Sequence, residues 1–243
     1  MSVIEPTDNR PVLFGNVPWR IGDIVKALVA AFVLVLVILA IAIIIIAVAG
    51  LGQSARDTAA IAANFVVEAA LLGSAWWFSV RKYGVGWSRL GFVKFTHGSV
   101  IPLVLLVLVL SIIVNMVYGV VISLLGVRSL LPGPLPPVFK EGGVGTILGA
   151  VLAVVVAPLV EETFFRGFLF AGIARRRGFL LGAVISALLF ALSHLQLGAI
   201  IPVFILGLFL AWLYKRTGTL WSNIAAHFTY NSIVLLIAIL GLG

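Results

Sequence analysis

The sequence predicts an all-α membrane protein, a polytopic bundle of about seven transmembrane helices with a cytoplasmic N-terminus. Hydrophobic residues make up 63% of the chain and charged residues 10%, against roughly 45–50% and about 25% in soluble domains. The apolar residues also form runs close to the roughly 20 residues that a spanning helix needs. A segment in lipid must satisfy its own backbone hydrogen bonds, and these runs are too long for barrel strands, so we expect helices.

Seven runs are expected to span the membrane. In chain order they are Lys26–Gly50, Thr58–Val80, Val100–Leu125, Val144–Ala174, Phe179–Leu195, Ala199–Tyr214 and Leu220–Leu242. The fifth and sixth lie at the short end of the roughly 17–25 residues that a span requires, so the count carries an error of one. The first run is longer than the apolar core of a signal peptide. The Pro-rich stretch Leu131–Lys140 is expected to be a linker, with an interfacial lid as the alternative.

The positions of Lys and Arg predict the orientation. With a cytoplasmic N-terminus, the cytoplasmic side receives Arg10, Arg20, Lys26, Arg81, Lys82, Arg89, Lys94, Arg175, Arg176, Arg177, Lys215 and Arg216. The opposite side receives Arg56, Arg128 and Lys140. This bias follows the positive-inside rule. We therefore expect the net charge of +8 to set the topology in the plasma membrane rather than to bind nucleic acid.

Several chemistries are excluded by what the spans lack. The chain has no cysteine, which removes disulfides, thiol nucleophiles and thiolate metal sites. Its three aspartates, Asp8, Asp23 and Asp57, lie outside the spans or at their edges, so no aspartyl dyad is available. No HExxH helix and no mid-span lysine occurs, whereas a serine route is only disfavoured because spans contain serines.

The fourth span contains charged residues, each of which costs about 3 kcal/mol at the bilayer centre on insertion scales. Glu162 and Arg166 are four residues apart, so they share a helical face and can form an ion pair. Glu161 is displaced by about 100° around the helix and can face a cavity. Pro158 is expected to kink the helix just before these carboxylates. The alternative is that the Glu162–Arg166 pair only holds helices together.

Polar residues also occur in the fifth and seventh spans. His194 lies near the end of the fifth, while His227 and Asn231 lie four residues apart in the seventh, with Asn223 one turn earlier. Each alone is typical of packing between membrane helices. Together they predict a site that converges on Glu161. Glu68, with Asn64 four residues before it, is a further buried acid that we expect to be structural, with pairing to Arg166 or a proton path as alternatives.

Two chemistries fit this set of residues. A carboxylate beside a histidine can activate water to cut an amide, and a His–Asn pair can donate to the oxyanion. Alternatively Glu161, His194, His227 and Asn231 could hold Zn²⁺ or another divalent metal, with bound water as the nucleophile. The residues by themselves leave both routes open.

Four segments resemble the motifs of a known family. Glu161-Glu162-Thr-Phe-Phe-Arg166 resembles the EExxxR motif of the CAAX protease and bacteriocin-processing family of intramembrane proteases (CPBP, also called Abi). Phe190-Ala-Leu-Ser-His194 matches its FxxxH motif, Phe204-Ile-Leu-Gly207 resembles its third motif, and His227-Phe-Thr-Tyr-Asn231 matches its HxxxN motif. The resemblance covers roughly Ala150–Ser232. Upstream, only Trp87–Phe92 is similar to a segment often found before the family's core.

The resemblance implies a role for each matching residue. Glu161 with His194 would activate water, and His227 with Asn231 would stabilise the oxyanion or complete a metal site. Glu162 with Arg166 would order the helix, and Gly207 would let the sixth helix pack closely. Family members are described both as metalloproteases and as glutamate proteases, so the metal stays open.

The resemblance also divides the chain. Residues 1–143 are expected to form an N-terminal cytoplasmic tail and three spans, and residues 144–243 a CPBP-like catalytic core of four spans. The expected function is hydrolysis of a peptide bond in a membrane-associated protein or peptide. The alternatives are a non-catalytic immunity or scaffold protein of the same family, and a transporter or proton relay.

Overall fold

The computed structural model describes residues 17–94, 97–131, 133 and 136–241, and within these ranges it is helical with no strand. The N-terminal half contains α1 (Ile21–Val48), α2 (Gln53–Trp76) with its π-helical continuation η2 (Trp77–Arg81), the 3-10 turn η3 (Trp87–Leu90), α3 (His97–Leu124), the 3-10 turn η4 (Arg128–Leu130) and the short α4 (Val138–Glu141). The C-terminal half contains α5 (Val144–Val151), η5 (Leu152–Val156), α6 (Ala157–Glu161), η6 (Glu162–Phe170), α7 (Ala171–Arg177), α8 (Phe179–Ser193), η7 (Leu197–Ala199), α9 (Ile200–Thr217) and α10 (Leu220–Ile239).

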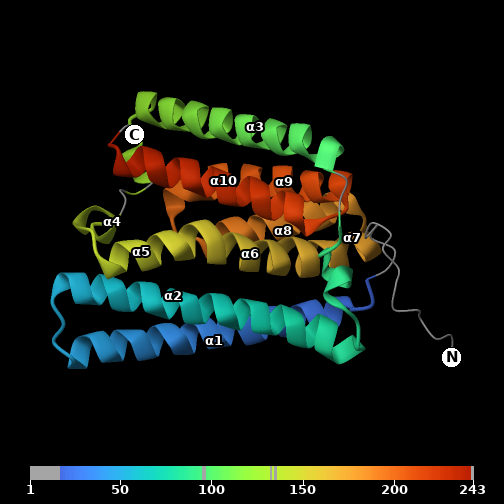
Figure 1. The fold of residues 1–243 in the computed structure, drawn as a ribbon, viewed down its shortest axis with the longest axis horizontal. Coiled ribbons are helices and arrows are strands. Elements are labelled where there is room, and N and C mark those ends of the chain that lie inside the picture. The colour runs from blue at the N-terminus through green and yellow to red at the C-terminus, as the bar shows by residue number, and fades with distance from the viewer. Residues whose placement is uncertain (1–16, 95–96, 132, 134–135, 242–243) are drawn as a thin grey trace.

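The all-α membrane bundle predicted from the sequence is confirmed. In the described part of the chain, 6 helices are long and apolar enough to cross a membrane, and Phe179–Ser193 is a shorter apolar helix at the position of the fifth predicted span. Successive long helices run in opposite directions along the bundle (Figure 1). The basic residues of the larger group that fall in the described ranges therefore gather at one end. Which end is cytoplasmic stays a prediction.

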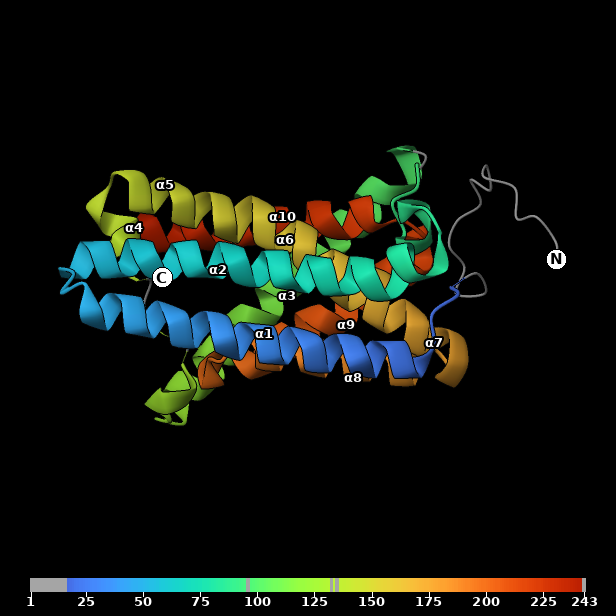
Figure 2. The same cartoon turned by 90° about the horizontal axis from the view of Figure 1, so that it is seen from below.

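The helices of the bundle form three layers: a pair on one side, a central group, and a single helix on the opposite side. The helices α1 and α2 lie against each other on one side, and α3 lies on the opposite side against α9 and α10 (Figures 1 and 2). Between them lie α8 and the long helix from Val144 to Arg177, which packs on α2 and on α10. The fourth predicted span is therefore the central helix of the fold.

The first helix begins before the Lys26 expected from hydrophobicity. The Asp23 carboxylate accepts a hydrogen bond of 2.8 Å from the backbone N–H of Arg20, which caps the first turn. Asp23 also accepts hydrogen bonds from Lys82 and Tyr83 at the end of α2. The bond to Asp23 raises the pKa of Lys82, which keeps the ammonium charged. This polar cluster joins α1 to α2 where their apolar stretches end.

The central helix departs from α-helical geometry twice, in the π-helical stretches η5 and η6. The sequence predicted a kink at Pro158, and η5 ends two residues before this proline. Its wider turn changes the backbone hydrogen-bond pattern close to the point where proline removes a donor. The second stretch, η6, begins at Glu162. Such π-helical turns often occur at functional sites.

The segment Trp87–Phe92 packs on the C-terminal half. Its Gly91 has a φ of 101°, a left-handed conformation that favours glycine. The Gly91 carbonyl accepts a hydrogen bond of 2.8 Å from the backbone N–H of Leu220. A Cβ on Gly167 would lie 2.5 Å from the carbonyl oxygen of Leu90, so only glycine allows this approach. The segment therefore fastens the central helix to the start of α10.

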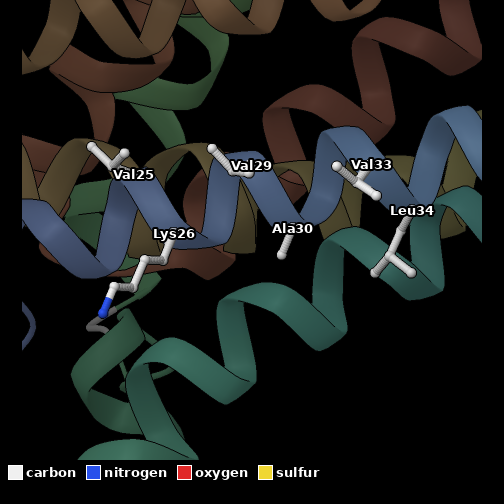
Figure 3. Close-up of a pocket in the computed structure, with 6 residues that line it drawn as sticks. All are labelled: Val25, Lys26, Val29, Ala30, Val33 and Leu34. Carbon is white, nitrogen blue, oxygen red and sulfur yellow. The ribbon is translucent and has the colours of Figure 1, made fainter.

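A hollow of about 550 Å³ lies along α1 (Figure 3). It is lined by Val25, Lys26, Val29, Ala30, Val33 and Leu34. The helix is the least covered of the spans, since 6% of its most apolar window is buried. None of the candidate site residues lines this hollow. They lie on the central helix, at the end of α8 and on α10.

Candidate active site

Glu162 is the centre of the polar network inside the bundle. Its side chain is fully buried at the start of η6. One carboxylate oxygen, Oε1, accepts hydrogen bonds from Arg166 Nη1 at 2.8 Å and from His227 Nδ1 at 3.1 Å. The other, Oε2, accepts a bond of 3.1 Å from the Asn223 amide. A carboxylate removed from water needs such donors to offset its desolvation.

Arg166 is also fully buried, and its predicted ion pair with Glu162 is present. Its second terminal nitrogen donates a bond of 3.3 Å to the Gly207 carbonyl on α9, and its guanidinium lies 4.2 Å from the centroid of the Phe190 ring. A Cβ on Gly207 would lie 2.8 Å from that of Ala187. The expected close packing of α9 at this glycine is therefore confirmed.

His227 joins the two glutamates. Because the carboxylate of Glu162 can only accept, the Nδ1 of His227 carries the proton in their bond. The opposite nitrogen, Nε2, lies 3.7 Å from Glu161 Oε2, which is longer than a hydrogen bond. The Glu161 side chain is 15% exposed, whereas that of Glu162 is 0% exposed. The buried glutamate thus orients the imidazole towards the glutamate that water can reach.

The negative charges of Glu161 and Glu162 can be balanced by positive charges on Arg166 and His227. Glu161 and Glu162 carry two negative charges when ionised, and Arg166 together with a doubly protonated His227 carries two positive charges. In that state Nε2 of His227 is a donor on the side of Glu161. A buried charge needs a partner of opposite sign, and Glu162 has one in Arg166, 2.8 Å away.

His194 reaches the network through Phe190. Its ring lies 4.9 Å from the Phe190 ring in an edge-to-face contact, and the His227 ring lies 5.7 Å from the same phenyl ring. Nδ1 of His194 donates to the Phe190 carbonyl at 2.8 Å, which leaves a lone pair on Nε2. Among the described residues His194 forms no hydrogen bond or ion pair with Glu161. The direct partner of Glu161 is His227 instead.

Asn231 ties α10 to the central helix. Its amide donates a bond of 2.8 Å to the Ala153 carbonyl in η5, where the π-helical turn alters the backbone pattern. The amide oxygen is not used in this bond. Asn231 thus lies on the same helix as His227 and one turn farther along, as predicted.

Two participants were not assigned a role from the sequence. Asn223 donates to Glu162 and to the Leu210 carbonyl, and its signal was its place on the stripe one turn before His227. Phe190 contacts Arg166 and both histidines, and the signal for it in the sequence was its place as the first residue of the FxxxH pattern. The proposed pairing of Glu68 with Arg166 is absent, because Arg166 is bonded to Glu162 and Gly207.

The residues present do not form a metal site as the structure stands. In the described ranges no three His, Cys, Asp or Glu side chains are grouped so that they could hold a metal ion. Nδ1 of each candidate histidine is bonded, to Glu162 in one case and to the Phe190 carbonyl in the other, so only Nε2 of each ring is left for a ligand. We therefore derive no step through a metal.

Comparisons with known proteins match the segment that carries this network. Residues 143–233 match the family model described as type II CAAX prenyl endopeptidase Rce1-like. Over 86 residues the chain is 29% identical to the Bacillus subtilis (strain 168) protein named "Putative membrane peptidase YdiL". That alignment covers 35% of this chain and 35% of the relative, so the chain spans about a third of the length of the curated relative it matches.

No solved structure matches the chain significantly. The family match contains every candidate residue from Glu161 to Asn231 and leaves out the first three predicted spans. Both comparisons support the resemblance drawn from the four motifs: residues 143–233 of this multi-pass membrane protein are similar to the Rce1-like type II CAAX prenyl endopeptidases and to a relative named as a membrane peptidase.

Proposed function

We propose that the protein is an intramembrane endopeptidase that hydrolyses a peptide bond of a membrane-associated protein or peptide. The observation that carries this proposal is the approach of His227 Nε2 to Glu161, 3.7 Å apart, with the opposite nitrogen held by Glu162. The similarity of residues 143–233 to the Rce1-like type II CAAX prenyl endopeptidases supports it. The substrate would reach the site from the bilayer or its surface, and the proposed location is the plasma membrane.

The proposed base is Glu161 rather than Glu162. Both oxygens of Glu162 accept hydrogen bonds, from Arg166, His227 and Asn223, and its side chain is fully buried, so water and substrate do not reach this carboxylate. Glu161 has no such set of donors, and its side chain is partly exposed. A general base must be within reach of the water whose proton it takes.

In the proposed reaction Glu161, assisted by the lone pair of His194, takes a proton from water. The resulting hydroxide attacks the carbonyl carbon of the scissile peptide bond and forms a tetrahedral oxyanion. His227, protonated on both nitrogens, donates from Nε2 to that oxyanion. Glu161 then delivers the proton to the amide nitrogen, the C–N bond breaks, and a carboxylic acid and an amine are released.

The remaining residues hold this arrangement in place. Glu162 and Arg166 fix the helix and the His227 ring, while Asn231 anchors α10 to η5 and provides an amide oxygen near the proposed site. Geometry of this kind matters because donors aligned before the reaction need no reorganisation when charge develops.

The experiment is a cleavage assay on the purified protein in detergent with a fluorogenic peptide library. We expect Glu161→Gln and His194→Ala to lower the rate by a factor of about 10² to 10⁴, which is the contribution of general acid–base catalysis. Asp57→Asn, a carboxylate at the far end of α2 bonded to Gln53, is the matched control and should retain the wild-type rate. Equal cleavage by all variants would contradict the assignment.

Three further measurements separate the alternatives. A chelator added to the active sample should leave the rate unchanged if Glu161 works without a metal, and loss of activity that is restored by Zn²⁺ would overturn that route. A non-catalytic immunity or scaffold role predicts that Glu161→Gln leaves the cellular phenotype unchanged. A transporter or proton relay predicts ion or proton flux in liposomes.

A further inference from the structure

Glu68 on α2 is a buried acid that the proposed reaction does not use. It lies outside residues 143–233, the segment that matches the family model. The helix α2 packs against α6, which ends at Glu161, and against η5 and η6. The residue is 8% exposed, and its Oε2 has no hydrogen-bond partner in the described structure.

Among the described residues no cation neutralises Glu68. Arg166, the one arginine in the centre of the bundle, is occupied by Glu162 and by the Gly207 carbonyl. The Asn64 side chain, one turn earlier on α2, donates to its own helix at the Ala60 carbonyl. The charge that does act on Glu68 is the negative charge of Glu161.

These contacts decide the state in which Glu68 can be buried. A second carboxylate beside Glu161 with no cation would be removed from water and repelled at once. A protonated Glu68 avoids both penalties and gains an O–H donor on the side of Glu161. An unpaired buried oxygen with no cation beside it, on a helix that packs against α6, therefore indicates that Glu68 is a neutral acid.

We propose that Glu68 is a positioning residue for Glu161: a neutral acid on α2 that presents a hydrogen-bond donor to the base and keeps its carboxylate turned towards His227. Its effect on cleavage rests on the proposed function. The N-terminal spans would then contribute a residue to a site whose other members all lie within the family match.

The test compares Glu68→Gln with Glu68→Leu in the full-length protein. Gln keeps a neutral polar group with N–H donors, whereas Leu keeps similar volume without a donor. We expect Glu68→Leu to lower kcat by about tenfold to a hundredfold with little change in KM, because a misplaced catalytic group costs that much. Glu68→Gln should restore the rate to within about threefold of wild type, since the donor is retained.

The matched control is Asn64→Leu on the same helix. Its side chain bonds only to the backbone of α2, so this variant should keep the wild-type kcat and KM. Loss of activity in Glu68→Gln equal to that in Glu68→Leu would show that an ionisable acid is needed and would overturn the proposal. Wild-type kcat in Glu68→Leu would overturn it as well.

A second readout does not depend on cleavage. Thermal unfolding of Glu68→Leu, Glu161→Gln and the double variant forms a cycle that measures whether the two side chains interact. We expect the Tm shifts not to add, because each variant removes the same contact. Additive Tm shifts would overturn the proposed contact, even in a protein that cuts peptides. Non-additive Tm shifts in a protein that cuts no peptide would refute only the proposed function.

Discussion

Replacing Arg166 by methionine should destabilise the protein strongly, since it leaves the buried charge of Glu162 without its cation. Methionine fills most of the same volume, so the loss is chiefly electrostatic. Breaking a buried ion pair from one side costs about 3–5 kcal/mol. Glu162 would keep its bonds from His227 and Asn223, both 3.1 Å long, but would lose the shortest one, of 2.8 Å. The guanidinium contact 4.2 Å from the Phe190 ring is lost too.

The assay is unfolding in mixed detergent micelles, followed by tryptophan fluorescence. Trp19 is a suitable reporter because it is buried and donates a 2.9 Å hydrogen bond to the Phe168 carbonyl in η6. Arg177→Met, an exposed arginine at the end of α7, is the control and should change the free energy of unfolding by less than about 1 kcal/mol.

The double variant Glu162→Gln with Arg166→Met sharpens the prediction. It removes both charges, so it should recover much of the stability lost in Arg166→Met alone. A cost below about 1 kcal/mol for Arg166→Met, or a double variant as unstable as the sum of its two parts, would refute the reasoning that the pair is a mutually neutralised buried unit.

Two further variants test the packing and the network. Gly167→Ala should cost about 1–3 kcal/mol because its Cβ would lie 2.5 Å from the Leu90 carbonyl oxygen, whereas Gly73→Ala, with no atom within 4 Å of the added Cβ, should be neutral or stabilising in the same unfolding assay. Asn223→Ala should cost about 1–3 kcal/mol because it removes a donor from the buried Glu162. Equal stability of the two glycine variants, or a wild-type unfolding curve for Asn223→Ala, would contradict these contacts.

The helices could be predicted because their cause is local. A run of apolar residues in lipid has to be helical, and the four-residue spacing of Glu162 and Arg166 places them on one face whatever the fold. The ends were less predictable. Hydrophobicity predicted that the first helix begins at Lys26. In the structure it begins at Ile21, because Asp23 caps its first turn. Several residues of the predicted Pro-rich linker (Pro132, Pro134, Leu135) lie outside the described residues.

The partners within the site could be predicted only in part. The motifs placed Glu161, His194 and His227 in one site, and the structure brings His227 to Glu161, with His194 joined through Phe190. The sequence paired Glu161 with His194 by analogy with the family. That pairing depends on how deeply α8 lies in the membrane, and α8 is the one short apolar helix of the described set.

The sequence by itself determined that this chain is a helical membrane protein, which of its charges lie within the spans, and which pair lies within one helix. Only the tertiary structure decided which glutamate His227 faces, that Asn223 completes the Glu162 network, and that Arg166 is bonded to Glu162 and Gly207 rather than to Glu68. The physical reason is that a membrane helix is apolar on its lipid side as well as on its packed side. Hydrophobic periodicity therefore does not mark the buried face, and the rotation and depth of each helix are set by contacts between distant segments.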